Sequence, residues 1–295
     1  MSSLKDKLKK LSFFTHYPKK HETLTINNNS EEFSSKEEIW GEWFTNDYTN
    51  GIWMFNELCV IIKFIGKDFI GHNDVHGDFS DSIVDWGDGT IGSPSQLAHT
   101  YETTGEHTII ITNFPHNTDN CFFQCNLTSI IVPPNITSLG DSCFGSCTSL
   151  TNIIIPSSVT SIGNNCFRLC TNLTNITIPS SVISLGSSCF YGCTSLTNVT
   201  IPSSVTSLAS GCFYECASLT NITIPSSITS LGGSCFSGCT SLTNVILNWT
   251  SSDKIVTYKS NWIANTNTQL KFIIPSGTTS LYTAKGYPSN KLEER

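Results

Sequence analysis

Charged residues are scarce in this chain of 295 residues, of which only 13% are Asp, Glu, Lys or Arg. An average globular protein carries about 25%. The polar character of the chain must therefore come from Ser, Thr and Asn. The formal net charge is −7 and the pI about 5.4, so the basic surface that a nucleic-acid binder needs to displace counterions is missing. We expect no nucleic-acid partner.

Long apolar runs are also absent. The longest run near the N-terminus, residues 11–14, includes Ser12 and is too short for the hydrophobic region of a secretory signal peptide. No run approaches the about 20 apolar residues that are needed to cross a bilayer. We therefore expect no signal peptide and no membrane insertion.

Catalytic residue types are missing from the middle of the chain. Between residues 127 and 247 the charged residues are Asp141, Arg168 and Glu215, and there is no histidine. Acid–base catalysis needs a paired acid and base, and an activated nucleophile needs a base beside it. No Gly-rich loop followed by Lys is present to hold a phosphate. We expect no enzymatic activity and no cofactor.

A 23-residue repeat fills this middle part instead. Its units begin at six leucines: Leu127, Leu150, Leu173, Leu196, Leu219 and Leu242. Five units are complete, the sixth diverges after LTNVIL, and a half unit, CFFQC, precedes the first at residues 121–125. A fixed period of this length is typical of solenoid proteins, in which each unit packs only on its neighbours.

One unit, LTNITIPSSVISLGSSCFYGCTS at residues 173–195, shows how a coil would form. Leu173, Ile176 and Ile178 are spaced to turn inward from a short strand, because strand side chains alternate between faces. Pro179 ends that strand, since it lacks a backbone donor. Residues 188–193 are predicted to form a short helical or 3-10 turn with Cys and Phe buried. The fold class is therefore predicted to be mainly β, a solenoid of 23-residue repeats.

These units resemble the BspA-like leucine-rich repeats, also called the Treponema pallidum type. The family pattern has a strand ending in Ile-Pro, then SVTSI, a small residue with Phe, Cys and finally Ser-Leu, and residues 155–173 read IPSSVTSIGNNCFRLCTNL. The resemblance covers residues 121–247. The family usually has Ala before the Phe, whereas this chain has Cys in five units: Cys143, Cys166, Cys189, Cys212 and Cys235. The resemblance implies surface adhesion and partner binding rather than catalysis.

A second resemblance lies ahead of the repeats. The sequence SIVDWGDGT at residues 82–90, then HTY at 99–101 and GEHTIIIT at 105–112, resembles the polycystic-kidney-disease (PKD) domain, a small β-sandwich of extracellular proteins. We therefore divide the chain into four parts: a tail or attachment segment at 1–36, a PKD-like β-sandwich at 37–115, BspA-like leucine-rich repeats at 116–247 and a C-terminal cap at 248–295.

Twelve of the 13 cysteines form six CFxxC pairs, from Cys121 and Cys125 to Cys235 and Cys239. Two thiolates at this spacing could meet a metal, but a thiolate site for one ion needs four ligands, and the pair recurs in every coil. Stacked coils would hold equivalent side chains parallel rather than converging, which disfavours disulfides. We expect a buried cysteine ladder in which Cys acts as a small apolar residue.

Histidines and aspartates gather in residues 72–88. His72 and His76 could reach a metal together with Asp78, and the aspartates of this stretch could hold calcium, which prefers oxygen ligands. Their spacing fits no EF-hand loop. We interpret them as solvated loop residues and expect no metal site.

The outward strand positions form two polar columns that define a candidate binding face. Its residues are Asn152, Asn175, Thr177, Asn198, Thr200, Asn221 and Thr223. Amides and hydroxyls bind by hydrogen bonds without the cost of desolvating charges. This face predicts a non-enzymatic binding or adhesion module for a protein or carbohydrate partner, at a cell or virus particle surface. The alternatives are a structural spacer on such a surface and, because of the regular Thr and Asn spacing, an ice-binding surface.

Overall fold

The computed structural model describes most of the chain from residue 60 onward and short stretches before it. The described residues are 23–26, 29–32, 44–45, 54–55, 60–70, 83–92, 98–112 and 118–295.

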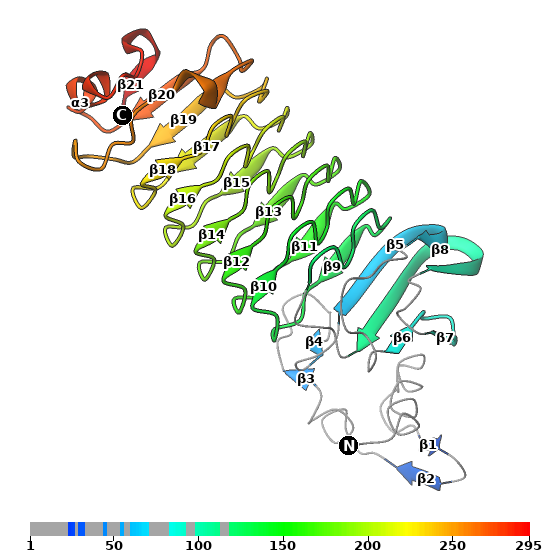
Figure 1. Cartoon of the computed structure of the whole chain (residues 1–295). Coiled ribbons are helices and arrows are strands. Elements are labelled where there is room, and N and C mark those ends of the chain that lie inside the picture. The colour runs from blue at the N-terminus through cyan, green and yellow to red at the C-terminus, as the bar shows by residue number, and fades with distance from the viewer. Residues whose placement is uncertain are drawn as a thin grey trace.

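From residue 118 the chain winds into a solenoid of stacked coils (Figure 1). One side is built of short parallel strands: β9 (Ser129–Ile131), β11 (Asn152–Ile154), β13 (Asn175–Thr177), β15 (Asn198–Thr200), β17 (Asn221–Ile224) and β19 (Asn244–Leu247). A second side is a five-stranded parallel sheet: β10 (Ser138–Leu139), β12 (Ser161–Ile162), β14 (Ser184–Leu185), β16 (Ser207–Leu208) and β18 (Ser230–Leu231). Turns make the third side.

The register of these sheets confirms the predicted repeat. Asn175 lies opposite Asn198, and Ser138 lies opposite Ser161, so residues 23 positions apart are neighbours on adjacent coils. Along β13 the middle residue, Ile176, is buried and its two neighbours are exposed, as strand alternation requires. The mainly β leucine-rich-repeat solenoid is therefore confirmed.

The third side differs from the predicted helical or 3-10 turn. The N–H groups of Tyr191 and Cys193 do donate to carbonyls three residues earlier, at 3.1 and 3.2 Å. However, Ser188 and Gly192 have φ values of 54° and 67°, in the left-handed region. A right-handed helix cannot pass through such residues. Each coil therefore closes with consecutive tight turns, and the helix expectation for residues 188–193 is corrected.

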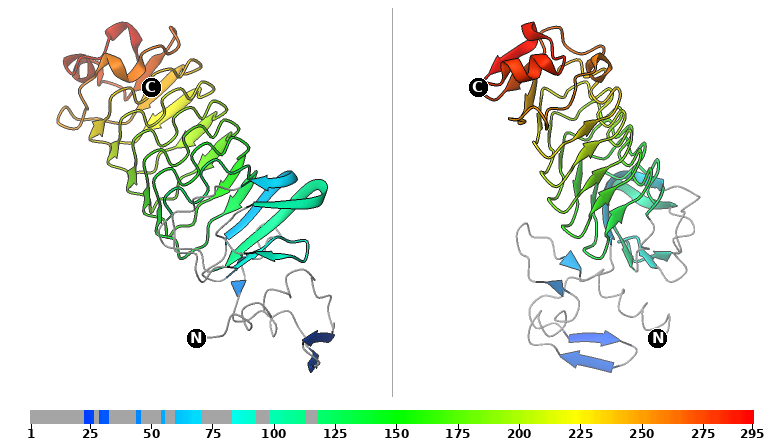
Figure 2. Two further views of the ribbon diagram at one scale, coloured as in Figure 1. Left: turned by 45° about the vertical axis from the view of Figure 1, so that its right-hand side comes forward. Right: turned by 60° about the vertical axis from the view of Figure 1, so that its left-hand side comes forward.

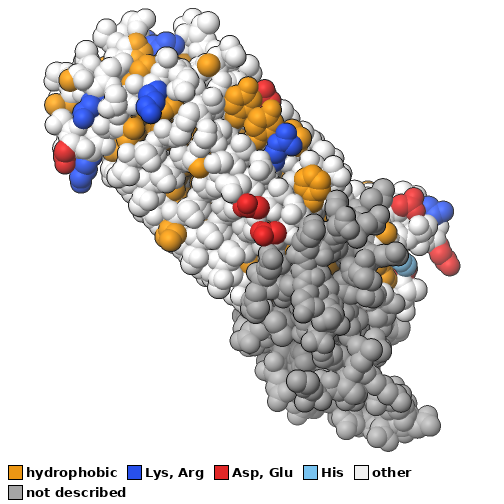
Figure 3. All heavy atoms as spheres, in the orientation of Figure 1, with side chains coloured by type: hydrophobic (Ala, Val, Ile, Leu, Met, Phe, Trp, Pro, Cys, Tyr) orange, Lys and Arg blue, Asp and Glu red, His pale blue; other side chains and the backbone are white. Residues whose placement is uncertain are grey.

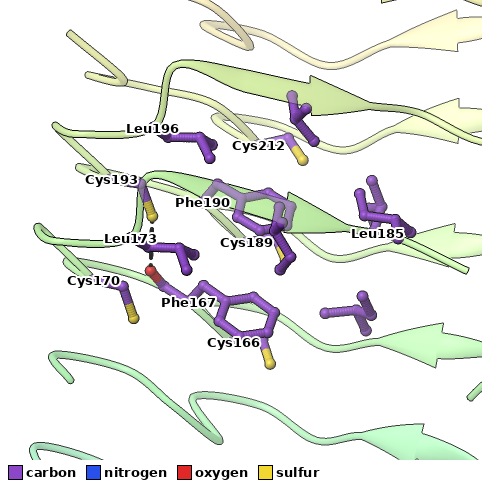
Figure 4. Close-up of a cluster of buried hydrophobic side chains, with 14 of the residues drawn as sticks. Cys166, Phe167, Cys170, Leu173, Leu185, Cys189, Phe190, Cys193, Leu196 and Cys212 are labelled. Carbon is purple, nitrogen blue, oxygen red and sulfur yellow. Dashed lines mark hydrogen bonds between the residues drawn. The ribbon is translucent and has the colours of Figure 1, made fainter. Parts of the chain in front are cut away.

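A column of phenylalanines forms the centre of the core. The rings of Phe122, Phe144, Phe167, Phe190, Phe213 and Phe236 stack nearly parallel, with neighbouring centroids 5.2–5.8 Å apart. Leucines such as Leu173, two residues before β13, and Leu185, at the end of β14, lie in the same core (Figure 4). Each ring is buried, so every coil contributes one large side chain to a continuous hydrophobic core.

The N-terminal end of the solenoid is covered by an antiparallel sheet. Strand β5 (Val60–Ile70) pairs with β9 of the first coil and with β8 (Ala98–Thr112), and β6 (Ile83–Asp85) and β7 (Ile91–Gly92) follow. This pairing occupies the edge that β9 would otherwise leave open, which removes a site for aggregation.

The PKD-like sandwich that we predicted is not shown by this arrangement. Within residues 60–112, the described strands belong to one sheet that continues into the solenoid. Farther upstream, β1 (Thr23–Ile26) pairs with β2 (Asn29–Glu32), and β3 (Phe44–Thr45) pairs with β4 (Met54–Phe55). The tail segment and the other parts of residues 37–115 lie outside the described residues, and the boundaries of the four parts stay predictions.

The C-terminal end is closed by a longer coil (Figure 2). Strand β20 (Lys271–Ile274) continues the sheet beside β19, and β21 (Leu292–Glu294) follows it. The 3-10 helix η1 (Ser260–Ile263) lies between β19 and β20, and the helix α3 (Thr279–Ala284) and the 3-10 helix η2 (Ser289–Lys291) lie between β20 and β21. Trp249 is fully buried and donates its indole N–H to the carbonyl of Ile228 at 2.8 Å, while Tyr282 donates to the Trp249 carbonyl.

Within the part of the chain that the structure describes, no helix has both the length and the apolar character that a membrane span requires.

Replacing Phe190 with Ala tests the central column. The ring lies between Phe167 and Phe213 at 5.3 and 5.2 Å, so its loss leaves a cavity that stiff backbone turns cannot fill. We expect Phe190→Ala to lower the free energy of unfolding by about 3–5 kcal/mol, measured by urea denaturation. Phe190→Leu should cost much less. Equal effects of the two substitutions would contradict a tightly packed ring column.

Candidate functional site

The candidate binding face consists of the outward residues of β11, β13, β15 and β17. Thr177 lies opposite Thr200, and Thr200 opposite Thr223, so three hydroxyl groups follow one another along the axis. Asn175 and Asn198 form a parallel column of amides beside them. Adjacent strands lie about 4.8 Å apart, which sets the spacing of the groups.

Hydrogen bonds fix the orientation of the asparagines. The amide nitrogens of Asn175, Asn198 and Asn221 donate to the hydroxyl of the preceding threonine, at 3.3, 3.4 and 3.0 Å. Of these threonines, Thr197 is itself anchored to the preceding coil, because its hydroxyl donates to the Thr174 carbonyl at 3.2 Å. The amides are therefore held in place before any ligand arrives, which lowers the entropy cost of binding.

The threonine hydroxyls are available to a ligand. Among the described residues, the side chains of Thr177, Thr200 and Thr223 have no hydrogen-bond partner. Thr177 and Thr200 are exposed, and Thr223 is half-buried. Ile154, with 42% of its surface exposed, and half-buried Ile246 flank the threonines at the two ends of the column. The face thus offers three hydroxyl groups between two apolar ends.

Six of the seven predicted residues lie in one sheet. Asn152 is exposed but belongs to β11, which pairs with β9 in the sheet that continues toward the N-terminus. Two charged groups at the margins of the face were missed. Lys63 of β5, which lies opposite Ser129 and forms an ion pair with Glu106 at 2.8 Å, comes from outside the repeats. Lys271 lies opposite Asn244 after a spacing of 27 rather than 23 residues, so the period could not reveal it.

In the WGDGT turn, the acidic side chain accepts hydrogen bonds from neighbouring residues. Asp88 accepts hydrogen bonds from Thr90 at 2.6 Å and from the ring of His99 at 2.7 Å. Burial alone would raise the pKa of Asp88, but these hydrogen bonds outweigh it and lower the pKa to about 2. The ring of His99 stacks on Trp86 at 4.7 Å, and Tyr101 donates to the Trp86 carbonyl at 2.6 Å.

Asp85 is likewise turned inward, with 2% of its surface exposed and its carboxylate accepting the N–H of Gly87 at 2.8 Å. Burial raises the pKa of this carboxyl group, and the nearby carboxylate of Asp88 adds to the rise. These two aspartates therefore stabilise a turn. The other members of the predicted acidic stretch, and His72 and His76, lie outside the described residues. Within the described residues, no group of three His, Cys, Asp or Glu side chains could hold a metal ion.

The cysteines form the predicted ladder and also make hydrogen bonds between neighbouring coils. The ten from Cys143 to Cys239 are buried thiols without a disulfide bond. The second cysteine of each pair donates its S–H to a phenylalanine carbonyl of the preceding coil, as Cys193 does to Phe167 at 3.1 Å (Figure 4). The same contact recurs for Cys147, Cys170, Cys216 and Cys239. Burial raises the pKa of these thiols far above their usual range, so they act as packing groups and donors rather than nucleophiles.

Family comparison agrees with this geometry. The model of the BspA type leucine-rich repeat region matches residues 112–243 and 160–289, in six copies. The chain belongs to the BspA-type leucine-rich repeat family. The match extends beyond the regular repeats into the C-terminal cap, where β20 continues the strand column of this BspA-type chain.

Solved structures of bacterial leucine-rich repeat proteins are similar to it. A Treponema pallidum leucine-rich repeat protein is 25% identical with a TM-score of 0.44, covering 59% of this chain and 77% of its own. A Bacteroides ovatus leucine-rich repeat protein is 20% identical (TM-score 0.34, 66% of each chain). A leucine-rich cell surface protein of Faecalibacterium prausnitzii is 22% identical (0.29, 56% and 59%). No curated protein matches the chain.

The buried thiols make stability depend on alkaline pH. In the unfolded chain a cysteine loses its proton near pH 8.5, whereas in the folded BspA-type chain burial raises the pKa, to about 12 for Cys235 and Cys239. Stability from these groups is therefore complete below about pH 8.5 and falls as the pH rises further, because only the unfolded state releases protons. We expect the Tm, measured in reductant, to fall steeply between about pH 8.5 and 10.5.

Alkylation provides an independent check on the same thiols. At neutral pH iodoacetamide should leave the ten cysteines from Cys143 to Cys239 unmodified in the native chain and react with all of them in urea. Rapid labelling of any of these ten cysteines in the native chain, located by peptide mass spectrometry, would contradict the buried ladder.

Proposed function

We propose that this BspA-type chain is a non-catalytic binding module whose strand face, the residues Asn175, Thr177, Asn198, Thr200, Asn221 and Thr223, contacts a protein or carbohydrate partner. The observation that supports this most directly is the column of three threonine hydroxyls, in register and without a partner among the described residues. A rigid sheet of this kind binds without reorganising, since its backbone and its amides are already fixed.

The composition of the face favours a neutral, hydroxyl-bearing partner surface. The sheet strands β13, β15 and β17 carry no charged residue. A ligand therefore needs no opposite charge and does not have to displace water from a charged side chain. Ile154 and Ile246 at the ends supply apolar contact area beside the hydroxyls. Pyranose rings and neutral protein surfaces both combine apolar patches with hydrogen-bonding groups. Binding should therefore change little between low and physiological salt.

A location at a cell or virus particle surface belongs to the same proposal. One protein with a similar fold is named a cell surface protein. Antibody labelling of intact cells or particles, with lysed samples as control, tests the location directly. Labelling only after lysis would redirect the search to partners inside the cell.

Two glutamates placed in the threonine column test the face. In Thr177→Glu with Thr200→Glu, two adjacent carboxylates would replace hydroxyls and add charges that a neutral ligand cannot compensate. We expect at least a tenfold loss of binding to the glycan or matrix-protein array spots that the unchanged chain recognises. Both positions are exposed, so the Tm should change little.

The matched control carries the same two charges on another side of the solenoid. Ser184 and Ser207 are exposed residues of β14 and β16, one coil apart. Ser184→Glu with Ser207→Glu should bind as the unchanged chain does. Equal losses in the two double variants would show a general charge effect. Full binding by the threonine variant would show that the strand face is the wrong surface, and an unchanged chain that binds nothing on either array would favour the structural spacer.

A further inference from the structure

The turn side of the solenoid carries a second surface, on which the repeat is broken. At the two positions that follow each stacked phenylalanine, three consecutive coils carry large side chains. We call these five residues the turn row: Arg168, Leu169, Tyr191, Tyr214 and Glu215. The coils on either side carry small residues at these positions, such as Gly145, Ser146 and Ser237. Figure 3 shows hydrophobic, basic and acidic side chains close together at one edge of the repeats, and further charged side chains elsewhere on the same face.

Contacts within the turn row hold its side chains in place. The rings of Tyr191 and Tyr214 stack at 5.0 Å with an interplanar angle of 3°. The guanidinium carbon of Arg168 lies 4.9 Å from the centre of the Tyr191 ring. Burial, the charge of the neighbouring Glu215 carboxylate and a side-chain hydrogen bond with it raise the pKa of Tyr191. The row thus presents a cation, two aromatic rings and an anion in a fixed order along the axis.

The turn row is kept at a conformational cost. Leu169 and Glu215 have φ values of 59° and 58°. This left-handed conformation is unfavourable for any residue with a Cβ. The equivalent residues of the next coils are Gly192 and Gly238, whereas Gln124 and Ser146 adopt it in the coils before the row, with φ values of 58° and 59°. Those glycines leave room for the row: a Cβ at Gly192 would lie 2.7 Å from Cδ2 of Leu169, and one at Gly238 would lie 2.9 Å from Cγ of Glu215. The left-handed turn therefore belongs to the repeat, and the row is distinguished by the large side chains that it carries there.

The charges of the turn row are arranged so that one row can pair with the row of a second copy of the chain. Arg168 and Glu215 are two coils apart, about 10 Å at the strand spacing. Among the described residues neither forms an ion pair. When a second row is turned by 180° about an axis through the coil of Tyr191, each Arg168 meets the Glu215 of the other row. A two-fold contact is self-complementary in this way, and tyrosine and arginine are among the residues enriched at the energetic centres of protein interfaces.

We infer that the turn row is the contact surface of a dimer, in which two copies of this chain cross antiparallel and pair Arg168 with Glu215 twice. The row's five residues are far fewer than the about 20–30 a side of a standard interface, so we expect a weak dimer, with a dissociation constant on the order of micromolar. The strand faces stay uncovered and point away from the contact side. This inference goes beyond the proposed function and does not require it.

Charge reversal gives a direct test by analytical ultracentrifugation of the full chain. Arg168→Glu places two carboxylates opposite each other at both ends of the contact, and Glu215→Arg places two guanidinium groups there. Each single variant should therefore dimerise at least tenfold more weakly than the unchanged chain. The double variant Arg168→Glu with Glu215→Arg restores both pairs and should dimerise again.

Mixing the two single variants is the decisive measurement. An Arg168→Glu chain and a Glu215→Arg chain complement each other at both ends, so an equimolar mixture should form a heterodimer although neither variant dimerises alone. Lys254→Glu, at an exposed position of the C-terminal cap, changes the net charge as Arg168→Glu does and should leave the dimer intact. A monomeric unchanged chain, single variants that dimerise normally, or a mixture that stays monomeric would each overturn the dimer.

A separate substitution distinguishes an effect on the dimer contact from an effect on folding. Leu169→Gly relieves the left-handed strain, so the Tm should be maintained or raised, while the dimer should weaken at least fivefold through lost apolar contact. A dimer of unchanged affinity in this variant would contradict the assigned surface.

Discussion

The same set of hydrogen bonds joins each coil of this solenoid to the next. Every side chain must therefore fit against its own equivalent one coil away. The backbone N–H of Phe190 donates to the Cys212 carbonyl at 2.8 Å, and the Phe190 carbonyl accepts the thiol of Cys216 at 3.1 Å. Flat rings and small donors satisfy this condition, whereas buried charges would repel one another in a column. The scarcity of charge in the repeats follows from the stacking.

The same condition explains the two ends, where an equivalent residue is missing. Inside the solenoid, Ser204 donates to the carbonyl of Val182, and Gly186 donates to the carbonyl of Ile162. At the C-terminal end the indole of Trp249 takes the place of the serine. At the N-terminal end the hydroxyl of Thr118 accepts the N–H of Gly140 at 2.6 Å in place of a carbonyl. The caps therefore work by supplying single hydrogen-bonding groups as well as apolar cover.

Periodicity let the sequence predict most of the solenoid, because 23-residue spacing assigns each position to a side of the coil without any knowledge of contacts. The buried phenylalanines, the cysteine ladder and the outward columns all follow from it. The pairing of β5 with β9 does not, since an antiparallel partner from outside the repeats leaves no periodic signal. The left-handed residues were missed for another reason: Leu169 and Glu215 are poor residues for that conformation, so local propensity pointed away from it.

Residues that depart from the repeat are therefore better indicators of function than residues that recur in every coil. A residue that recurs in every coil is explained by stacking, as Cys193 and Phe190 are. Leu169 is not explained in this way, because Gly192 occupies the same place in the next coil with less strain. The threonine column is an intermediate case, since Thr177, Thr200 and Thr223 fit the strand but give way to isoleucine at both ends. Stacking permits either residue at these outward positions, so the change marks the part of the face at which we propose that hydroxyl groups contact a partner.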